Sequence, residues 1–320
     1  MNVWSFILDN LENDSSVALL YVVDSDGSSP GRKGFTMAVN SEGVFEGTIG
    51  GGMMEVKMIE LAKSKLSGSD LHPIIKEQFH DKLHSKNQSG LICSGSQIVA
   101  CIPLNKKDVD VVNTIVGRKA DIFLSINNEQ GLQISQKENE VITITDDDHF
   151  ECILKIKSQK TIHIFGAGHV GLALAKQMAL LDYKIMHYDD RPDLPSLSKN
   201  ESGNKIKLID YSKLESELNF HPSDVVVIVS FSYRSDKIIL KQLYKQSFAY
   251  IGLMGSDHKI ATLKNELKEE GITTEDLSAV FTPIGINMYS KTAAEIAVSI
   301  AGQIILETNK HLPTGRKYQV

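Results

Sequence analysis

The spacing of apolar residues changes character near the middle of the chain. Beyond residue 160, short apolar runs at 161–165 and 184–188 flank a segment, 170–181, in which apolar residues recur at helical spacing. Short apolar runs that alternate with helical patterns are typical of a parallel sheet with crossover helices. Further strands are predicted at 207–209, 224–230 and 249–253. The pattern predicts a Rossmann-type α/β domain over residues 160–320.

Two later helices in this half are marked by the residues at their ends. Ser256 is a suitable N-cap for a helix at about 257–270, and Gly271 is a suitable stop. Thr292 and Glu295 have the spacing of a capping box, ahead of isoleucines that recur every four residues. Both helices fit the strand–helix alternation of the predicted parallel sheet.

The first half of the chain has a less regular pattern. Apolar residues recur at helical spacing over 3–11, and a loop rich in glycine, serine and proline occupies 26–34. Strand-like runs are predicted at 18–23, 35–39, 44–48, 96–103, 122–125 and 141–145. Short strands combined with a few helices predict an N-terminal mixed α+β domain over residues 1–159.

Composition narrows the possible partners. The chain has 320 residues and a formal net charge of −6, so it lacks the basic surface that a nucleic-acid backbone requires. Its first residues do not resemble a signal peptide, and no apolar run reaches the roughly 20 residues that span a bilayer. We therefore expect a cytoplasmic protein with no nucleic-acid or membrane partner.

The cysteines and histidines indicate neither disulfides nor a metal site. Cys93, Cys101 and Cys152 are too few for a disulfide framework and form no C-x-x-C pair. His80 and His84 lie four residues apart, but no further ligand has the spacing of a zinc site. Cys93 lies in a polar loop and is either a reachable thiol or a structural cysteine.

The strongest chemical signal is a glycine-rich segment between a predicted strand and a predicted helix. Residues 166–171 have the sequence Gly-Ala-Gly-His-Val-Gly, which is G-x-G-x-x-G. Its first glycine permits a tight turn, the second lets a phosphate approach the backbone, and the third lets helix and strand pack closely. We predict that Gly166, Gly168, His169 and Gly171 bind a phosphate at the helix N-terminus. The alternative is a set of glycines that only shape a turn.

Asp189 ends the second predicted strand, about 20 residues beyond the glycines, where an acidic side chain accepts ribose hydroxyls in dinucleotide-binding domains. A carboxylate at this position repels a 2′-phosphate, which favours NAD. Because Arg191 is nearby and could accommodate a 2′-phosphate, an NADP-like ligand stays an alternative.

A second glycine run stands before a helical pattern in the first half. Gly50, Gly51 and Gly52 form a possible second anion cradle, although they lack the strand order of a Rossmann unit. Glu55, in the first turn of that helix, is either a ligand or a residue that complements the helix dipole. Arg32 and Lys33, on the preceding loop, are possible cationic partners of a phosphate.

A dehydrogenase would need a residue that handles a proton near the nicotinamide. Tyr233 and Lys237 have the Y-x-x-x-K spacing that places both on one helix face, where the lysine eases ionisation of the tyrosine. The pair directly follows a predicted strand instead of lying within a later helix. An NAD-dependent oxidoreductase that uses this pair is therefore an alternative function, and a nucleotide-sensing regulatory protein is another.

Several blocks, in this order along nearly the whole chain, resemble the XdhC/CoxI family of accessory proteins for molybdenum hydroxylases such as xanthine dehydrogenase. The blocks that carry the resemblance are residues 27–30 (GSSP), 35–39 (FTMAV), 47–55 (GTIGGGMME), 165–171 (FGAGHVG), 189–192 (DDRP), 250–256 (YIGLMGS), 283–285 (PIG) and 295–300 (EIAVSI).

The resemblance implies a chaperone more than an enzyme. It implies a protein that binds molybdenum cofactor (molybdopterin), aids its maturation and sulfuration, and inserts it into a xanthine dehydrogenase-like molybdenum hydroxylase. The expected partners are that hydroxylase, a cysteine desulfurase and a second copy of the chain in a homodimer. We expect nine residues to bind this cofactor, and we assign no catalytic residue: Gly166, Gly168, His169, Gly171, Asp189, Gly50, Gly51, Gly52 and Glu55.

The chain also departs from the family pattern. Met53 stands where the family usually has a cysteine, and Cys93 is followed by serine and glycine in place of two glycines. Residues 230–233 (SFSY) replace a Thr-His-Asp-His run, and Asn287 replaces an aspartate. These changes remove soft and acidic groups from the expected ligand cleft.

Overall fold

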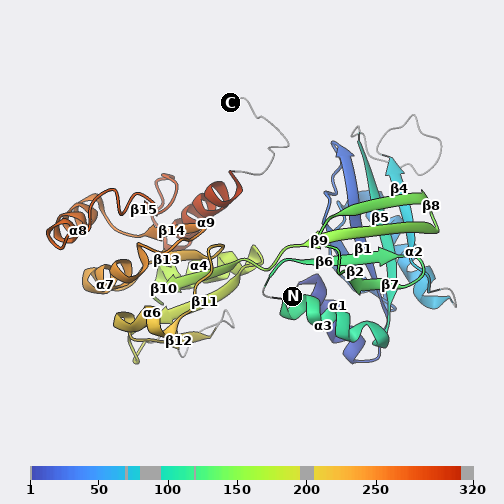
Figure 1. Ribbon diagram of the computed structural model, residues 1–320, viewed down its shortest axis with the longest axis horizontal. Helices are drawn as coiled ribbons and strands as arrows, with labels where there is room; N and C mark the ends of the chain where they lie inside the picture. Colours follow the sequence, from blue (N-terminus) through green and yellow to red (C-terminus); the bar gives the residue numbers. More distant parts are fainter. Residues whose placement is uncertain (1, 69–70, 80–94, 119, 195–204, 311–320) are drawn as a thin grey trace. The chain divides into compact units, whose positions relative to one another are not determined.

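A computed structural model describes residues 2–68, 71–79, 95–118, 120–194 and 205–310 (Figure 1). The chain divides into two compact units, Met1–Ser158 and Gln159–Val320. Within the described residues, none of the helices is both long and apolar enough to cross a membrane. The described part of the chain also contains no group of three or more potential metal ligands.

The first unit contains two antiparallel sheets. One has the order β3-β2-β1-β5-β4, and the other has the order β7-β6-β9-β8. The strands are β1 (Val17–Gly27), β2 (Thr36–Asn40), β3 (Phe45–Gly47), β4 (Ile74–Phe79), β5 (Gly95–Leu104), β6 (Ile122–Asn127), β7 (Gly131–Ile134), β8 (Val141–Asp146) and β9 (His149–Ile156). The helices are α1 (Val3–Glu12), α2 (Gly52–Ser67), the 3₁₀ helix η1 (Lys106–Asp108) and α3 (Val109–Gly117).

Strand β1 is buried on both faces, which explains its unbroken apolar run. Leu19 and Tyr21 face one core, with α1, α3 and the second sheet. Leu20 and Val22 face a separate core that Met58 of α2 helps to cover. Alternate side chains of one strand therefore join the two layers of this unit.

The second unit is a six-stranded parallel sheet of order β12-β11-β10-β13-β14-β15. Its strands are β10 (Thr161–Phe165), β11 (Lys184–Asp189), β12 (Ile206–Leu208), β13 (Val225–Ile228), β14 (Tyr250–Leu253) and β15 (Val280–Phe281). Its helices are α4 (His169–Leu180), the 3₁₀ helix η2 (Tyr211–Lys213), α6 (Leu214–Glu217), α7 (Tyr233–Leu243), α8 (Asp257–Glu269) and α9 (Ala293–Asn309). Counted within the unit, this is the 3-2-1-4-5-6 order of Rossmann domains.

Helices cover both faces of the parallel sheet. Residues of α4 and α9 pack on the face that carries Ile164 and Val227. Residues of α7 and α8 pack on the face that carries Phe165 and Ile228. The strand order reverses between β10 and β13, so ligands are expected at the carboxyl ends of these two strands.

The predicted fold class is confirmed, including the mixed first unit and the Rossmann-type second unit. Ser256 caps α8, and Thr292 and Glu295 form the predicted capping box of α9. Strand β4 was not predicted, because its central residues, Lys76 to Gln78, are polar. It is the edge strand beside β5, where Glu77 is exposed, whereas Gln78 is buried and accepts a hydrogen bond from Gln97 Nε2 at 3.3 Å.

Candidate functional site

The turn between β10 and α4 requires glycine at two positions. Gly166 has φ +118°, and a Cβ there would lie 2.3 Å from the carbonyl oxygen of Val229. A Cβ on Gly171 would lie 1.9 Å from the carbonyl oxygen of Gly166. Close packing of this turn against β13 and against its own helix therefore excludes any side chain at these positions.

Gly168 is different, because a Cβ there would meet nothing within 4 Å. Its φ of −75° and ψ of −176° are accessible to any residue. Gly168 is the N-cap of α4 and has no side-chain capping bond, whereas Ser232, Ser256 and Thr292 cap α7, α8 and α9. The N-terminus of α4 therefore has no side-chain cap and has open space at Gly168, which suits an incoming anion.

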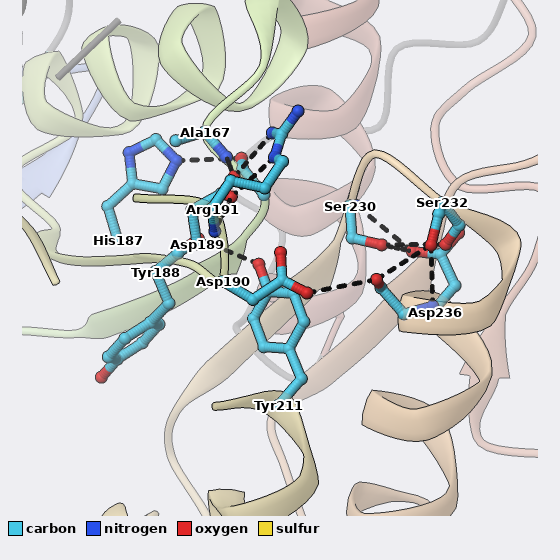
Figure 2. Close-up of polar contacts among 12 residues, drawn as sticks. Ala167, His187, Tyr188, Asp189, Asp190, Arg191, Tyr211, Ser230, Ser232 and Asp236 are labelled. Carbon is cyan, nitrogen blue, oxygen red and sulfur yellow. Dashed lines mark hydrogen bonds and ion pairs between the residues drawn. The ribbon is translucent and has the colours of Figure 1, made fainter. Parts of the chain in front are cut away.

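Asp189 lies at the end of β11, beside this turn, as the sequence predicts. Both oxygens of its carboxylate already accept hydrogen bonds from the protein. One oxygen accepts from the Ala167 N–H at 2.7 Å and from Arg191 Nη2 at 2.8 Å. The other accepts from Arg191 Nε at 2.8 Å and from the Arg191 N–H at 3.0 Å. The side chain is 2% exposed. In this arrangement, shown in Figure 2, Asp189 ties the turn to the loop after β11.

The negative charge of Asp189 is balanced by the neighbouring Arg191 guanidinium. Burial alone would raise the pKa of its carboxyl, but hydrogen bonds from Arg191 and Ala167 outweigh it and hold the pKa below the usual value. The Arg191 guanidinium also lies 4.8 Å from the ring centre of Phe231, which is 81% exposed. A ribose would therefore have to displace Arg191 before its hydroxyls could reach this carboxylate.

His187, two residues before Asp189 on β11, supports the turn from beneath. Its Nε2 lies 3.0 Å from the carbonyl oxygen of Gly166, to which a neutral ring donates a hydrogen bond. Burial lowers the pKa of this imidazole. The sequence motifs did not indicate His187. The parallel pairing of β10 with β11 places it opposite Ile164, two residues before Gly166, and this register is the signal that could have indicated it.

The carboxyl edge of the sheet continues across β13 and β14. The N–H of Val229 donates to Phe165, and that of Met254 donates to Ile228, both at 2.9 Å. The loops that follow β10, β13 and β14 therefore stand side by side in that order.

A buried ion pair holds two of these loops together. Asp236 is fully buried, accepts a 2.5 Å bond from Ser230 Oγ and pairs with Lys259 Nζ at 2.5 Å. Burial raises the pKa of the Asp236 carboxyl, against the opposing effects of Lys259 and Ser230. Lys259 Nζ also donates to the carbonyl oxygen of Met254 at 3.3 Å. Asp236 and Lys259 belong to none of the motifs found in the sequence, and their pairing was not predicted.

Tyr233 and Lys237 are not arranged as an acid/base pair. Lys237 Nζ pairs with Glu266 at 2.6 Å and with Glu270 at 2.7 Å, and these two carboxylates raise its pKa. Burial and the Glu266 carboxylate raise the pKa of Tyr233 to about 12. A catalytic tyrosine would need the opposite shift, so these contacts join α7 to α8 and argue against the proton-transfer role.

In the first unit, the turn at Gly50 to Gly52 already contains a carboxylate. Oε2 of Glu55 accepts from Thr48 Oγ1 at 2.6 Å and from the N–H groups of Ile49 and Gly51, each at 3.0 Å. Glu55 thus occupies the position that an external anion would take at the start of α2.

Arg32 and Lys33 bind other groups of the protein, and the thiols of Cys101 and Cys152 are buried. Lys33 pairs with Glu140 at 3.0 Å, and Arg32 donates to the carbonyl oxygen of Gly27. Cys101 and Cys152 are buried, and burial raises the pKa of each thiol to about 12. Cys93 lies outside the described residues.

Comparisons with known proteins agree with this architecture. Residues 162–304 match the XdhC Rossmann domain, and residues 11–71 match the XdhC and CoxI family. The chain belongs to the XdhC/CoxI family. The resemblance inferred from the sequence blocks is thereby confirmed.

Two relatives align with this XdhC/CoxI chain over nearly all of its length. The chain is 25% identical over 316 residues to the uncharacterized protein YqeB of Escherichia coli (strain K12), covering 98% of this chain but 48% of YqeB. The chain thus spans about half the length of that relative. It is 22% identical to a probable xanthine dehydrogenase subunit of Bacillus subtilis (strain 168), covering 94% of this chain and 96% of that protein.

A solved structure shows the same fold. The crystal structure of a protein described as a xanthine dehydrogenase from Bacillus halodurans superimposes with a TM-score of 0.75 and 18% identity, covering 99% of both chains. Within this XdhC/CoxI fold, the segments that resembled the family at 165–171, 189–192, 250–256 and 283–285 all lie at the carboxyl edge of the parallel sheet.

Proposed function

We propose that this protein binds molybdenum cofactor and assists its maturation and insertion into a xanthine dehydrogenase-type molybdenum hydroxylase. The observation that carries the proposal is the uncapped N-terminus of α4, where Gly168 leaves the backbone open. Molybdopterin bears a phosphate, and such a group suits N–H donors at a helix N-terminus. The backbone of Gly168, His169 and Val170 would hold that phosphate. The chemistry at molybdenum would remain with the hydroxylase.

The state of Asp189 favours a phosphate monoester over a dinucleotide. Its oxygens are satisfied by Arg191 and by the turn, and the side chain is 2% exposed. A ligand that needs no ribose contact leaves this network intact. Molybdopterin without an attached nucleotide is such a ligand.

A client of the xanthine dehydrogenase type is supported by the name of the Bacillus subtilis relative. The strand order and the glycine turn alone would equally suit NAD. The ion pairs of Lys237 with Glu266 and Glu270 engage the lysine that the oxidoreductase hypothesis requires, which favours a carrier.

The proposal is tested with cofactor released anaerobically from a purified molybdenum hydroxylase. After incubation with the protein and gel filtration, we expect molybdenum and pterin fluorescence to co-elute with the wild type and to be absent from Gly168→Asp. The loaded wild type should also restore activity to apo-xanthine dehydrogenase. NADH is titrated in parallel, and NADH binding accompanied by hydride transfer would contradict the proposal.

A further inference from the structure

A cavity lies on the same edge of the parallel sheet, beyond β14. Its volume is about 380 Å³, within the range of about 300–1,000 Å³ that small-molecule sites occupy. Its walls come from the turn after β14, the segment 284–290 and the start of α9. Lining residues include Met254, Ser256, Ile286, Asn287, Tyr289 and Ile296.

The described lining of the cavity carries no charge. Among the residues that the structure describes, none that line it is acidic, basic or a histidine. Isoleucine and methionine side chains supply flat apolar surface, which suits an aromatic ring. Asn287 is exposed in this lining, and its carboxamide can both donate to and accept from a ligand. This lining fits an uncharged, flat heteroaromatic ring better than a second phosphate.

The segment that shapes the cavity is held in place by α9. The N–H of Gly285 donates to Gln303 Oε1 at 2.7 Å, and Ser299 Oγ donates to the carbonyl oxygen of Ile286 at 2.6 Å. Tyr289, at the rim, has φ +56° and is 87% exposed. A bulky residue in this left-handed conformation is uncommon, and an exposed ring at the mouth of a cavity is available for stacking.

The cavity lies within reach of the glycine turn. Gly166 follows β10 and Met254 follows β14, with β13 between these two strands. Adjacent strands are separated by about 4.8 Å, so the two strand ends are about 10 Å apart. The glycine turn and the cavity therefore lie along the same edge of the sheet, with one strand between them, as a ligand with a phosphate at one end and a ring system at the other would require.

We infer that this cavity binds the pterin ring system of the ligand whose phosphate lies at Gly168. The inference rests on the proposed function and adds a second contact region to it. The phosphate lies at the N-terminus of α4, and the ring lies between Tyr289 and the isoleucine walls, with Asn287 at its polar edge.

The test uses 6-hydroxymethylpterin, a pterin without phosphate, and follows its fluorescence on titration with the full chain. Ile286→Glu places a carboxylate in the cavity and should weaken binding about tenfold or more. Ile305→Glu is the matched control, because both isoleucines are 40% exposed in the same unit and Ile305 does not line the cavity. Asn287→Leu, which keeps the size of the side chain, should weaken binding without adding charge.

Gly168→Asp separates this inference from the proposed function. It should leave binding of the free pterin unchanged while it abolishes binding of the phosphate-bearing cofactor. Equal pterin affinity in wild type, Ile286→Glu and Asn287→Leu would overturn the ring site, even if Gly168→Asp still lost the cofactor. Displacement of the pterin by nicotinamide at comparable concentration would assign the cavity to a nicotinamide ring and overturn the pterin assignment.

Discussion

Two glycine-rich turns of this protein precede helices, and they differ in what their backbone N–H groups contact. At Gly50 to Gly52, the carboxylate of Glu55 accepts from Ile49 and Gly51. At the start of α4, Asp189 accepts from the N–H of Ala167 in the turn, and Arg191 balances its charge. Gly168 beyond it stands in open space. One turn contains its own carboxylate, and we propose that the other accepts an anion from a ligand.

The difference shows why glycine content alone does not define an anion site. Both turns have helix N–H groups, and each contains at least one glycine with positive φ. The two turns differ in the position of the nearest carboxylate. Glu55 accepts hydrogen bonds from the N–H groups of its own turn, whereas Asp189 is bound by Arg191 beside its turn. Substitutions at these groups should therefore change stability and anion binding to different extents in the two turns.

Gly171→Ala should have the largest effect on stability. Its Cβ would lie 1.9 Å from the carbonyl oxygen of Gly166, so α4 must move away from β10, at a cost of about 3 kcal/mol. Urea unfolding of the full chain measures the loss. Gly168→Ala is the control, because its Cβ meets nothing, and it should change stability by less than about 0.5 kcal/mol. Equal losses would show that the turn is packed differently.

Arg191→Ala should cost about 2–3 kcal/mol at neutral pH, because it leaves the Asp189 carboxylate buried without its counter-ion. Since the folded pKa of Asp189 is lowered, its stabilising effect is present above the usual carboxyl pKa, about 4, and is lost as pH falls through the folded value. The deficit of the variant should therefore shrink on acidification. Thermal unfolding of both proteins across this range measures it, and a deficit independent of pH would contradict the ion-pair account.

Glu55→Ala should cost about 1–2 kcal/mol, because the N–H groups of Ile49 and Gly51 lose their acceptor. The vacated turn should then bind an external anion. Added phosphate should raise the melting temperature of the variant more than that of the wild type. Sodium chloride at matched ionic strength is the control, and no difference between the two salts would mean that the glycines do not form a cradle.

Gly168→Asp should stabilise the protein slightly, by about 0.5 kcal/mol, because aspartate is a good N-cap and favours the positive end of the helix dipole. The same carboxylate should abolish phosphate binding at α4. Calorimetric titration with phosphate, alongside thermal unfolding, measures both effects. If the variant gains stability and still binds phosphate, the phosphate binds somewhere other than the N-terminus of α4.

The parallel sheet could be predicted from the sequence because its strands and helices are marked by strong local patterns. Residues 161–165 and 184–188 are apolar runs, Ser256 caps a helix, and Thr292 and Glu295 form a capping box. Strand β4 gave no such signal, because an edge strand is stabilised by pairing with β5 and tolerates polar residues.

The glycine turn was also predicted from sequence, but the states of its acidic neighbours were not. The spacing places Asp189 beside the turn, yet only the fold shows that Arg191 occupies both of its oxygens. Glu55 likewise reaches back to its own turn through side-chain geometry that spacing does not specify. Asp236 and Lys259 are brought together from two helices, a tertiary contact without a local pattern.

The most direct test of the contrast between the two turns is an amide chemical-shift titration of isotopically labelled protein with inorganic phosphate. We expect the N–H signals of Gly168 and His169 to shift in a saturable manner. We expect those of Gly50 to Gly52 to stay in place while Glu55 is present. Saturable shifts at Gly50 to Gly52, with none at Gly168 and His169, would contradict the assignment of the open anion site to α4.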